Sequence, residues 1–198
     1  MKKSESFKRG MNAFLVFVVI ASFFLFFLES FTLTGNVTSG STTSNVSIAK
    51  YLAISFGTNL SQGIQFGTVN ALPATNINAT HNYDGTSTGT TYTIDVSTDS
   101  NSHVDFCIKA NAGLTSAALD VIGLGNETYA ALNLTNSTHP LLSNETAMTT
   151  SYVKSYASSI APGNSSYWRF WLDIPSAQPS GDYNNSVSFE GVTSGGIC

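Results

Sequence analysis

Apolar residues alternate with polar ones along residues 46–192, and this period of two predicts strands that bury one face. Gly, Asn, Asp, Pro and Ser cluster between the alternating stretches, as in residues 82–85 and 179–182, and mark turns. The apolar positions form six candidate strands, which are Val46/Ile48/Leu52/Ile54/Phe56, Ile64/Phe66, Tyr92/Ile94/Val96, Val104/Phe106/Ile108, Trp168/Phe170/Leu172/Ile174 and Val187/Phe189.

Residues 46–198 contain no sustained apolar stripe of an amphipathic helix. Residues 114–124 come nearest and fit either a short helix or a further strand. Seven or eight short strands in roughly 150 residues are typical of two sheets packed face to face. The pattern therefore predicts an all-β fold, an immunoglobulin-like or jelly-roll β-sandwich, preceded by one N-terminal hydrophobic helix.

That helix is predicted by residues 13–28, AFLVFVVIASFFLFFL, in which only Ser22 is polar. With its flanks, residues 11–33, the run is long enough to span a bilayer. Residues 1–10 carry Lys2, Lys3, Lys8 and Arg9 against Glu5, and Glu29 follows the run. By the positive-inside rule, we expect a cytoplasmic N-terminus and a cell-surface remainder, membrane-anchored or extracellular.

Three fates of this segment are compatible with the sequence. The first is an uncleaved signal anchor, because no Ala-x-Ala-like site follows Leu28. The second is cleavage by an ordinary signal peptidase near residues 30–35. The third is cleavage after Gly10, because residues 8–10, Lys-Arg-Gly, resemble the processing site of archaeal type IV prepilins. In that family the hydrophobic helix becomes the filament core, although Leu15 stands here where many bacterial pilins carry Glu.

The predicted organisation has four parts: a basic N-terminus (1–10), a transmembrane or signal helix (11–33), a linker (34–45) and an extracellular domain (46–198). Residues 34–45, TGNVTSGSTTSN, have no apolar periodicity and are predicted to be a flexible tether.

Composition supports an exported domain. Only 10% of residues are charged, whereas 28 Ser and 23 Thr make up about a quarter of the chain. From residue 31 onward, the chain has four scattered basic residues and ten acidic ones, which gives a net charge of −6. Nucleic-acid binding needs clustered Lys and Arg, so we expect no nucleic acid as a partner.

The Asn-x-Ser/Thr signal for N-glycosylation is enriched. Seventeen Asn in a chain with 51 Ser and Thr predict about four such sequons by chance, and the sequence has ten. We therefore expect N-linked glycans. The candidate acceptors are Asn36, Asn45, Asn59, Asn78, Asn126, Asn133, Asn136, Asn144, Asn164 and Asn184.

The chain has two cysteines, Cys107 and Cys198, and in an exported protein this pair predicts a disulfide. Alternation places Cys107 on the opposite face of its strand from Phe106 and Ile108, so we expect the bridge near the surface.

Two groups of sequence features resemble known surface proteins. Residues 66–69 (FGTV), 170–175 (FWLDIP), 179–183 (PSGDY) and 187–189 (VSF) look like the opening and closing strands of immunoglobulin-like surface modules. The layout is similar to archaeal surface-filament (pilin-like) subunits and, more distantly, to the TasA/camelysin fibre group. This resemblance implies structural assembly, including a strand donated to a neighbouring subunit. The chain departs from it in having an apolar segment long enough for a permanent anchor.

Signals for catalysis or cofactors are weak. Two Ser-x-x-Lys matches, at residues 47–50 and 151–154, lie in strand-like sequence, where the two side chains point to opposite faces. His81, His103 and His139 are isolated, and Asp95, Asp99 and Asp105 fit no calcium-loop register. We expect no enzyme activity, no cofactor and no metal.

The aromatic stretch at residues 167–171 allows either packing or stacking on a sugar, since alternation sends Trp168 and Phe170 to one face and Tyr167 and Trp171 to the other. The sequence thus predicts a non-enzymatic structural glycoprotein of the cell surface that self-assembles or binds other surface proteins. The alternative is a membrane-anchored adhesin or a carbohydrate- or protein-binding module.

Overall fold

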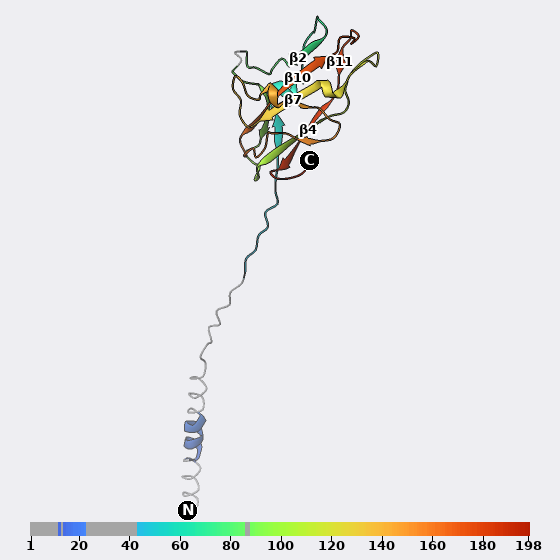
Figure 1. The fold of residues 1–198 in the computed structure, drawn as a ribbon. Helices are drawn as coiled ribbons and strands as arrows, with labels where there is room; N and C mark the ends of the chain where they lie inside the picture. The colour runs from blue at the N-terminus through green and yellow to red at the C-terminus, as the bar shows by residue number, and fades with distance from the viewer. Residues whose placement is uncertain (1–11, 13, 23–42, 86–87) are drawn as a thin grey trace, which may run out of the picture. The chain divides into compact units, whose positions relative to one another are not determined.

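The computed structural model describes residue 12 and residues 14–22, 43–85 and 88–198 (Figure 1). The chain divides into two compact units, Met1–Ser47 and Ile48–Cys198. In the first unit Asn12 and residues 14–22 are helical, and residues 43–47 have no regular structure. No helix among the described residues is both long and apolar enough to cross a membrane. Most of the predicted helix (11–33) and tether (34–45), together with Gly10 and Asn36, lies outside the described residues.

The second unit is built from short antiparallel strands, which confirms the predicted all-β class. Its helical elements are single turns: α2 (Thr58–Ser61), η1 (Leu124–Asn126) and η2 (Leu142–Asn144). Its strands are β1 (Ile54–Phe56), β2 (Ala74–Asn78), β3 (Tyr92–Val96), β4 (Val104–Ala110), β5 (Leu114–Ser116), β6 (Val121–Ile122), β7 (Glu127–Leu132), β8 (Thr146–Ala147), β9 (Val153–Lys154), β10 (Ser165–Ile174), β11 (Tyr183–Asn184) and β12 (Val187–Thr193).

The strands form three sheets. The largest has the order β1-β3-β10-β7-β8, and β2 also pairs with β10. A second sheet, the β4 sheet, has the order β12-β4-β9, and a third, small sheet has the order β11-β5-β6. The strands β3, β4, β7, β9, β10 and β12 alternate between the large sheet and the β4 sheet along the chain. Figure 1 shows β7 and β10 side by side in the large sheet.

The large sheet and the β4 sheet share one aromatic core. The Trp168 ring of β10 lies 5.1 Å from the Phe189 ring of β12 and 6.3 Å from the Phe106 ring of β4, measured between centroids. Phe170 of β10 meets Phe189 at 6.5 Å. The Trp168 indole N–H, although buried, donates to the Ser166 hydroxyl at 2.9 Å, so burial leaves no polar atom unpaired there. The fold is therefore β-sandwich-like.

Side chains also close one flank of this core, where β1 and β12 approach each other. The rings of Phe56 and Phe189 are 5.4 Å apart. A Cβ atom at Gly191 of β12 would lie only 3.1 Å from a methyl of Val104 and 3.3 Å from one of Ile54. Glycine at this position therefore allows the two edge strands to pack closely.

Four of the predicted strands are confirmed as β3, β4, β10 and β12. The first prediction is wrong in extent, because only residues 54–56 pair with β3, and Val46 and Ile48 are exposed. The second is wrong in type: Ile64 and Phe66 pack against the core from a segment without regular structure, which follows the unpredicted turn α2. Residues 114–124, left open between helix and strand, form the antiparallel pair β5 and β6.

Candidate functional site

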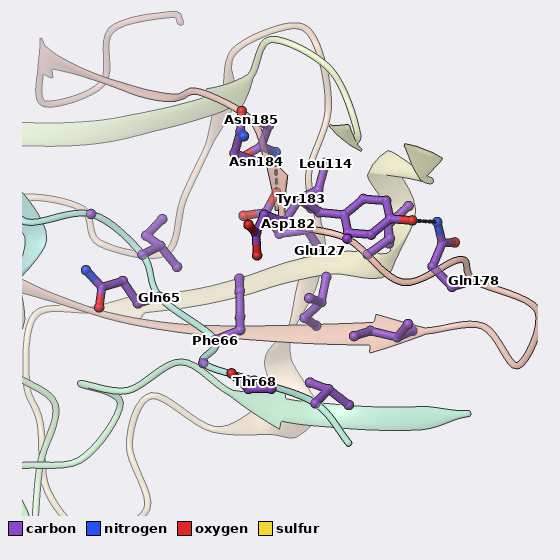
Figure 2. Close-up of a pocket in the computed structure, with 18 of the residues that line it drawn as sticks. Gln65, Phe66, Thr68, Leu114, Glu127, Gln178, Asp182, Tyr183, Asn184 and Asn185 are labelled. Carbon is purple, nitrogen blue, oxygen red and sulfur yellow. Dashed lines mark hydrogen bonds between the residues drawn. The ribbon is translucent and has the colours of Figure 1, made fainter. Parts of the chain in front are cut away.

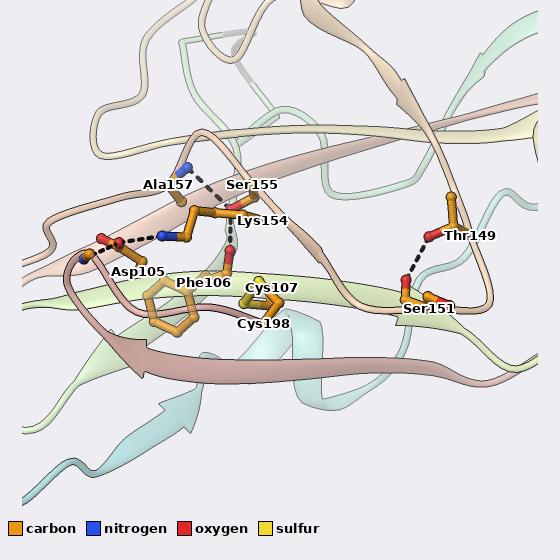
Figure 3. Close-up of a disulfide and its surroundings, with 10 residues drawn as sticks. Asp105, Phe106, Cys107, Thr149, Ser151, Lys154, Ser155, Ala157 and Cys198 are labelled. Carbon is orange, nitrogen blue, oxygen red and sulfur yellow. Dashed lines mark hydrogen bonds and ion pairs between the residues drawn. A yellow bond between two sulfur atoms is a disulfide. The ribbon is translucent and has the colours of Figure 1, made fainter.

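The predicted disulfide joins Cys107 and Cys198, with an S–S distance of 2.05 Å and a Cα–Cα distance of 5.9 Å (Figure 3). It ties the C-terminus to the middle of β4. Cys107 does lie on the face opposite Phe106, but it is completely buried, whereas Cys198 is exposed. The expectation of a surface bridge is therefore correct only for its C-terminal half.

Asp105, two residues before Cys107, is a second attachment point for the C-terminal segment. Its carboxylate accepts hydrogen bonds from the Lys154 ammonium (2.9 Å), the Ser159 backbone N–H (2.7 Å) and the Gly195 backbone N–H (2.8 Å). Burial raises the pKa of Asp105, but these hydrogen bonds outweigh it and bring the pKa down to about 2. Asp105 is thus held as a carboxylate by β9, the following loop and the C-terminal segment.

The outer face of β10 is covered by other parts of the chain. Trp171 is 3% exposed, and its indole N–H donates to the Asn78 side-chain oxygen of β2 at 2.9 Å. Trp168 and Phe170 are in the core, and Tyr167 is half-buried. Packing therefore accounts for Trp168, Phe170 and Trp171, and none of these three rings is free to stack on a sugar.

Arg169 lies between these aromatic residues and is only 2% exposed. Its guanidinium donates to the backbone carbonyls of Asn82, Asn136, Thr138 and Pro140 at 2.8–3.0 Å. Burial lowers the pKa of Arg169, an effect opposed by Tyr83, whose ring lies 4.4 Å from the guanidinium carbon. Arg169 thus binds two loop segments, residues 79–85 and 133–141, to the large sheet.

The described sequons lie mainly at the surface. Asn45, Asn78, Asn133, Asn136, Asn144, Asn164 and Asn184 are exposed, and Asn59 and Asn126 are half-buried. The Asn59 amide donates to the Thr91 hydroxyl at 2.7 Å, and the Asn78 side-chain oxygen accepts from Trp171 and Asn82. None of the ten sequons falls in the β4 sheet, that is in β4, β9 or β12.

The histidines and loop carboxylates do not converge. His81 packs edge-on against Tyr92, His103 is exposed, and the ring of His139 contacts Asn136 in its own loop. Asp95 accepts from the Ser165 hydroxyl at 2.6 Å. Within residues 43–85 and 88–198 no three His, Cys, Asp or Glu side chains are grouped so as to hold a metal ion.

The β4 sheet has an open edge. Among the described residues β12 pairs only with β4, so one side of this seven-residue strand has no strand partner. Residues 46–48, which continue the apolar spacing of β1, belong to no strand in the described part of the chain, and Val46 and Ile48 are 87% and 78% exposed. The side chain of Asn101 binds the backbone N–H of Tyr51 and the carbonyl of Ala49.

A pocket of about 870 Å³ lies beside the start of β12. Figure 2 shows Gln65, Phe66 and Thr68 on one side of it and Glu127, Asp182, Tyr183 and Asn185 on the other. Leu114, Ile122 and Leu172, which form a small apolar cluster of their own, also line it. The pocket thus combines apolar walls with two carboxyl groups.

No protein-family model, no curated protein and no solved structure matches the chain.

Sequence reasoning did not predict the roles of Asp105, Glu127 and Arg169. The sequence contained a weak indication that Arg169 is buried and hydrogen-bonded, because it is the lone basic residue within an aromatic stretch that is predicted to be a strand. It contained none for Glu127 and Asp105, because their partners are far away in the sequence, 58 residues away for Glu127 and 49 to 90 for Asp105.

Proposed function

We propose that this chain is a non-enzymatic structural glycoprotein of the cell surface, a pilin-like filament subunit or a cell-coat subunit. The N-terminal apolar segment exports or anchors it, and its folded domain is an immunoglobulin-like or jelly-roll sandwich. The alternation of β3, β4, β7, β9, β10 and β12 between two sheets favours the jelly-roll alternative. The observation that carries the proposal is the unpaired edge of β12.

An open strand edge is a template for another strand, since its N–H and C=O groups lack partners in the chain. β12 offers such an edge over seven residues, with one charge, Glu190, at its centre. A strand added there gains main-chain hydrogen bonds. Assembly then follows from β-sheet extension between copies.

The segment before β1 is suited to supply the added strand. Val46 and Ile48 have the spacing of one strand face, and both are exposed to water. Burying both in an interface would contribute about 3 kcal/mol. Lys50, two residues further along, is opposite in charge to Glu190. Residues 46–50 of one copy would therefore pair with β12 of the next.

The distribution of sequons supports the same surface. Glycans on the large sheet, on β11 and on the loops between strands would cover much of the domain, whereas the β4 sheet has no sequon. A bulky modification on an assembling edge would block pairing, so an unmodified β4 sheet suits assembly.

Two matched variants of the full chain test the proposal, and neither changes the Asn45-Val46-Ser47 sequon. Ile48→Lys places a charge on the apolar face of the segment, and Ala49→Lys places the same charge on the opposite face. Electron microscopy of cell-surface preparations should show regular fibres or a lattice for the native chain and for the second variant. The first variant should lose them. Regular assemblies formed equally well by all three proteins would contradict the proposed strand pairing, and their absence from the native chain would contradict a structural subunit.

The pocket beside β12 favours one second candidate, a membrane-anchored adhesin or a carbohydrate- or protein-binding module. In that case the native chain would be dispersed on the surface without fibres, and it would bind glycans or a surface protein. Glycan-array binding by the full chain, together with a lack of fibres, would select this alternative.

A further inference from the structure

Glu127 is a buried carboxyl group that forms no ion pair with the described residues. It is 1% exposed and lines the pocket beside β12. Among the described residues its only side-chain hydrogen bond comes from the Asn185 amide, which donates to Oε2 at 2.6 Å. Oε1 has no such partner. No fully buried side-chain oxygen of the described residues lacks a hydrogen-bond partner, so Oε1 keeps some accessible surface. Because Glu127 lines the pocket, we infer that Oε1 faces it.

The lining of the pocket supplies negative charge and apolar surface together. Asp182, from the loop before β11, is the second carboxyl group in the lining, and no Lys, Arg or His is among the lining residues. Leu114, Ile122 and Leu172 form an apolar wall beside Glu127. Such a site complements a ligand with an aliphatic stem and a positive end.

We propose that this pocket binds a primary alkylammonium group, with the ammonium on Glu127 and the aliphatic stem against Leu114, Ile122 and Leu172. An ionised carboxylate that is buried without a cation is unfavourable, and a bound ammonium removes that penalty. The ammonium donates hydrogen bonds to Oε1 and is attracted by Asp182, while the stem displaces water from the apolar wall. Val187 and Phe189 of β12 also line this pocket, but the proposed ammonium site does not rest on the proposed assembly.

Protonation of Glu127 should be linked to binding. Burial raises the pKa of Glu127, and the hydrogen bond from Asn185 opposes this only in part. An ammonium beside the carboxyl group lowers its pKa again, so binding releases protons. Asp182 and Tyr183 are the other titratable groups in the lining. Affinity should therefore rise as the pH increases through the raised pKa of Glu127.

The test uses the full chain in a non-ionic detergent and n-butylammonium as the probe, followed by ligand-detected NMR and calorimetry. n-Butanol, which has the same stem and no charge, should bind at least tenfold more weakly. Calorimetry in two buffers of different ionisation enthalpy should report proton release. Equal binding of n-butanol, or no binding of n-butylammonium, would overturn the proposal.

Variants separate a site from general attraction to an acidic protein. Glu127→Gln should weaken n-butylammonium binding at least tenfold, whereas Glu145→Gln, which removes an exposed carboxyl group bonded to Thr128, should leave it unchanged. Asp182→Asn, at an exposed loop position, should weaken n-butylammonium binding two- to threefold. This variant provides the test if Glu127→Gln does not fold. Unchanged binding in both pocket variants would refute the site.

The ammonium has two possible sources, a free amine or a lysine side chain of a protein. N-acetyl-lysine methylamide carries the lysine side chain together with two peptide groups. The side-chain amides of the lining residues Gln65, Gln178 and Asn184 could hydrogen-bond to these peptide groups. Tighter binding of this compound than of n-butylammonium would support a lysine side chain as the natural ligand. The reverse order would support a free amine.

Discussion

Asp105 and Arg169 are almost fully buried charged residues, and backbone groups supply most of their hydrogen bonds. Each binds segments that are distant in the sequence. Asp105 joins β4 to β9 and to the C-terminal segment, and Arg169 joins β10 to two loops. Removing either charge leaves buried polar groups without partners, which costs more than the net value of the hydrogen bonds.

Asp105→Asn tests the first of these attachments through its pH dependence. The pKa of Asp105 is about 2 in the folded chain, compared with the ordinary value of 3.8 that we take for the unfolded chain. Ionisation of Asp105 therefore favours the folded state. This contribution, about 2 kcal/mol, is complete above pH 4 and is lost as the pH falls towards 2. Urea unfolding should therefore show the variant about 2–3 kcal/mol less stable near pH 6, with a smaller difference near pH 2.

Asp99→Asn is the matched control, because Asp99 is an exposed aspartate in the nearby turn at residues 97–100. Its unfolding free energy should stay within about 0.5 kcal/mol of the native value. A difference between the Asp105 variant and the native chain that is constant from pH 6 to pH 2 would contradict the assigned ionisation.

At the residue scale, the sequence predicted pairings that have few alternatives. Two cysteines in a chain allow one intramolecular bridge, and Cys107 and Cys198 form it. The hydrogen-bond partners of Arg169 were not predictable, because four carbonyls from loops 29 to 87 residues away converge only after the sheet has formed. The pocket around Glu127 was missed for the same reason.

At the element scale, alternation succeeded where large apolar residues are regularly spaced. β3, β4 and β10 carry Ile, Val, Phe or Trp on their inner face. The missed strand β7 has Ala130 and Ala131 at its centre, which are buried but give a weak signal. The overextended first strand shows the opposite case, because Val46 and Ile48 have the right spacing without a partner strand to pair with. The spacing of apolar residues shows that a segment can form a strand, but a strand forms only where a partner strand supplies its hydrogen bonds.

The disulfide gives a prediction at this scale, since it attaches the last residues of the chain to β4. It closes a loop of 91 residues in sequence separation, for which chain entropy gives about 4–5 kcal/mol. Cys107→Ala with Cys198→Ala should therefore lower the unfolding free energy by roughly 3–5 kcal/mol in urea, without loss of the β-sheet circular dichroism.

Reduction of the native chain by dithiothreitol should reproduce this loss and should have no effect on the double variant. If the variant unfolds at the same urea concentration as the oxidised native chain, the bridge does not contribute to stability. In that case the hydrogen bond from the Gly195 N–H to Asp105 would be enough to hold the C-terminal segment against β4.

At the scale of the whole molecule, the described sequons and the β4 sheet lie in separate parts of the folded domain. The described sequons of the folded domain lie in α2, β2, β11 and the segments around η1, β7, η2 and β10. The β4 sheet instead carries the disulfide, the unpaired edge of β12 and exposed Tyr156 and Ile197 nearby. A glycan coat over the first set would leave the second as the protein-facing surface, which is the arrangement that assembly requires.

Mapping of glycopeptides by mass spectrometry tests this separation. Asn133, Asn144 and Asn164 are exposed, and their side chains make no hydrogen bond to the described residues, so each should carry a glycan. Asn59 should be the least modified, because its amide is half-buried and donates to the Thr91 hydroxyl. Thr91→Val removes that acceptor and should raise the occupancy of Asn59 without affecting Asn164. Bare asparagines at all three exposed positions would contradict the proposal that the chain is a glycoprotein. Asn59 occupied as fully as Asn164 would mean that acceptor choice does not depend on the folded surface.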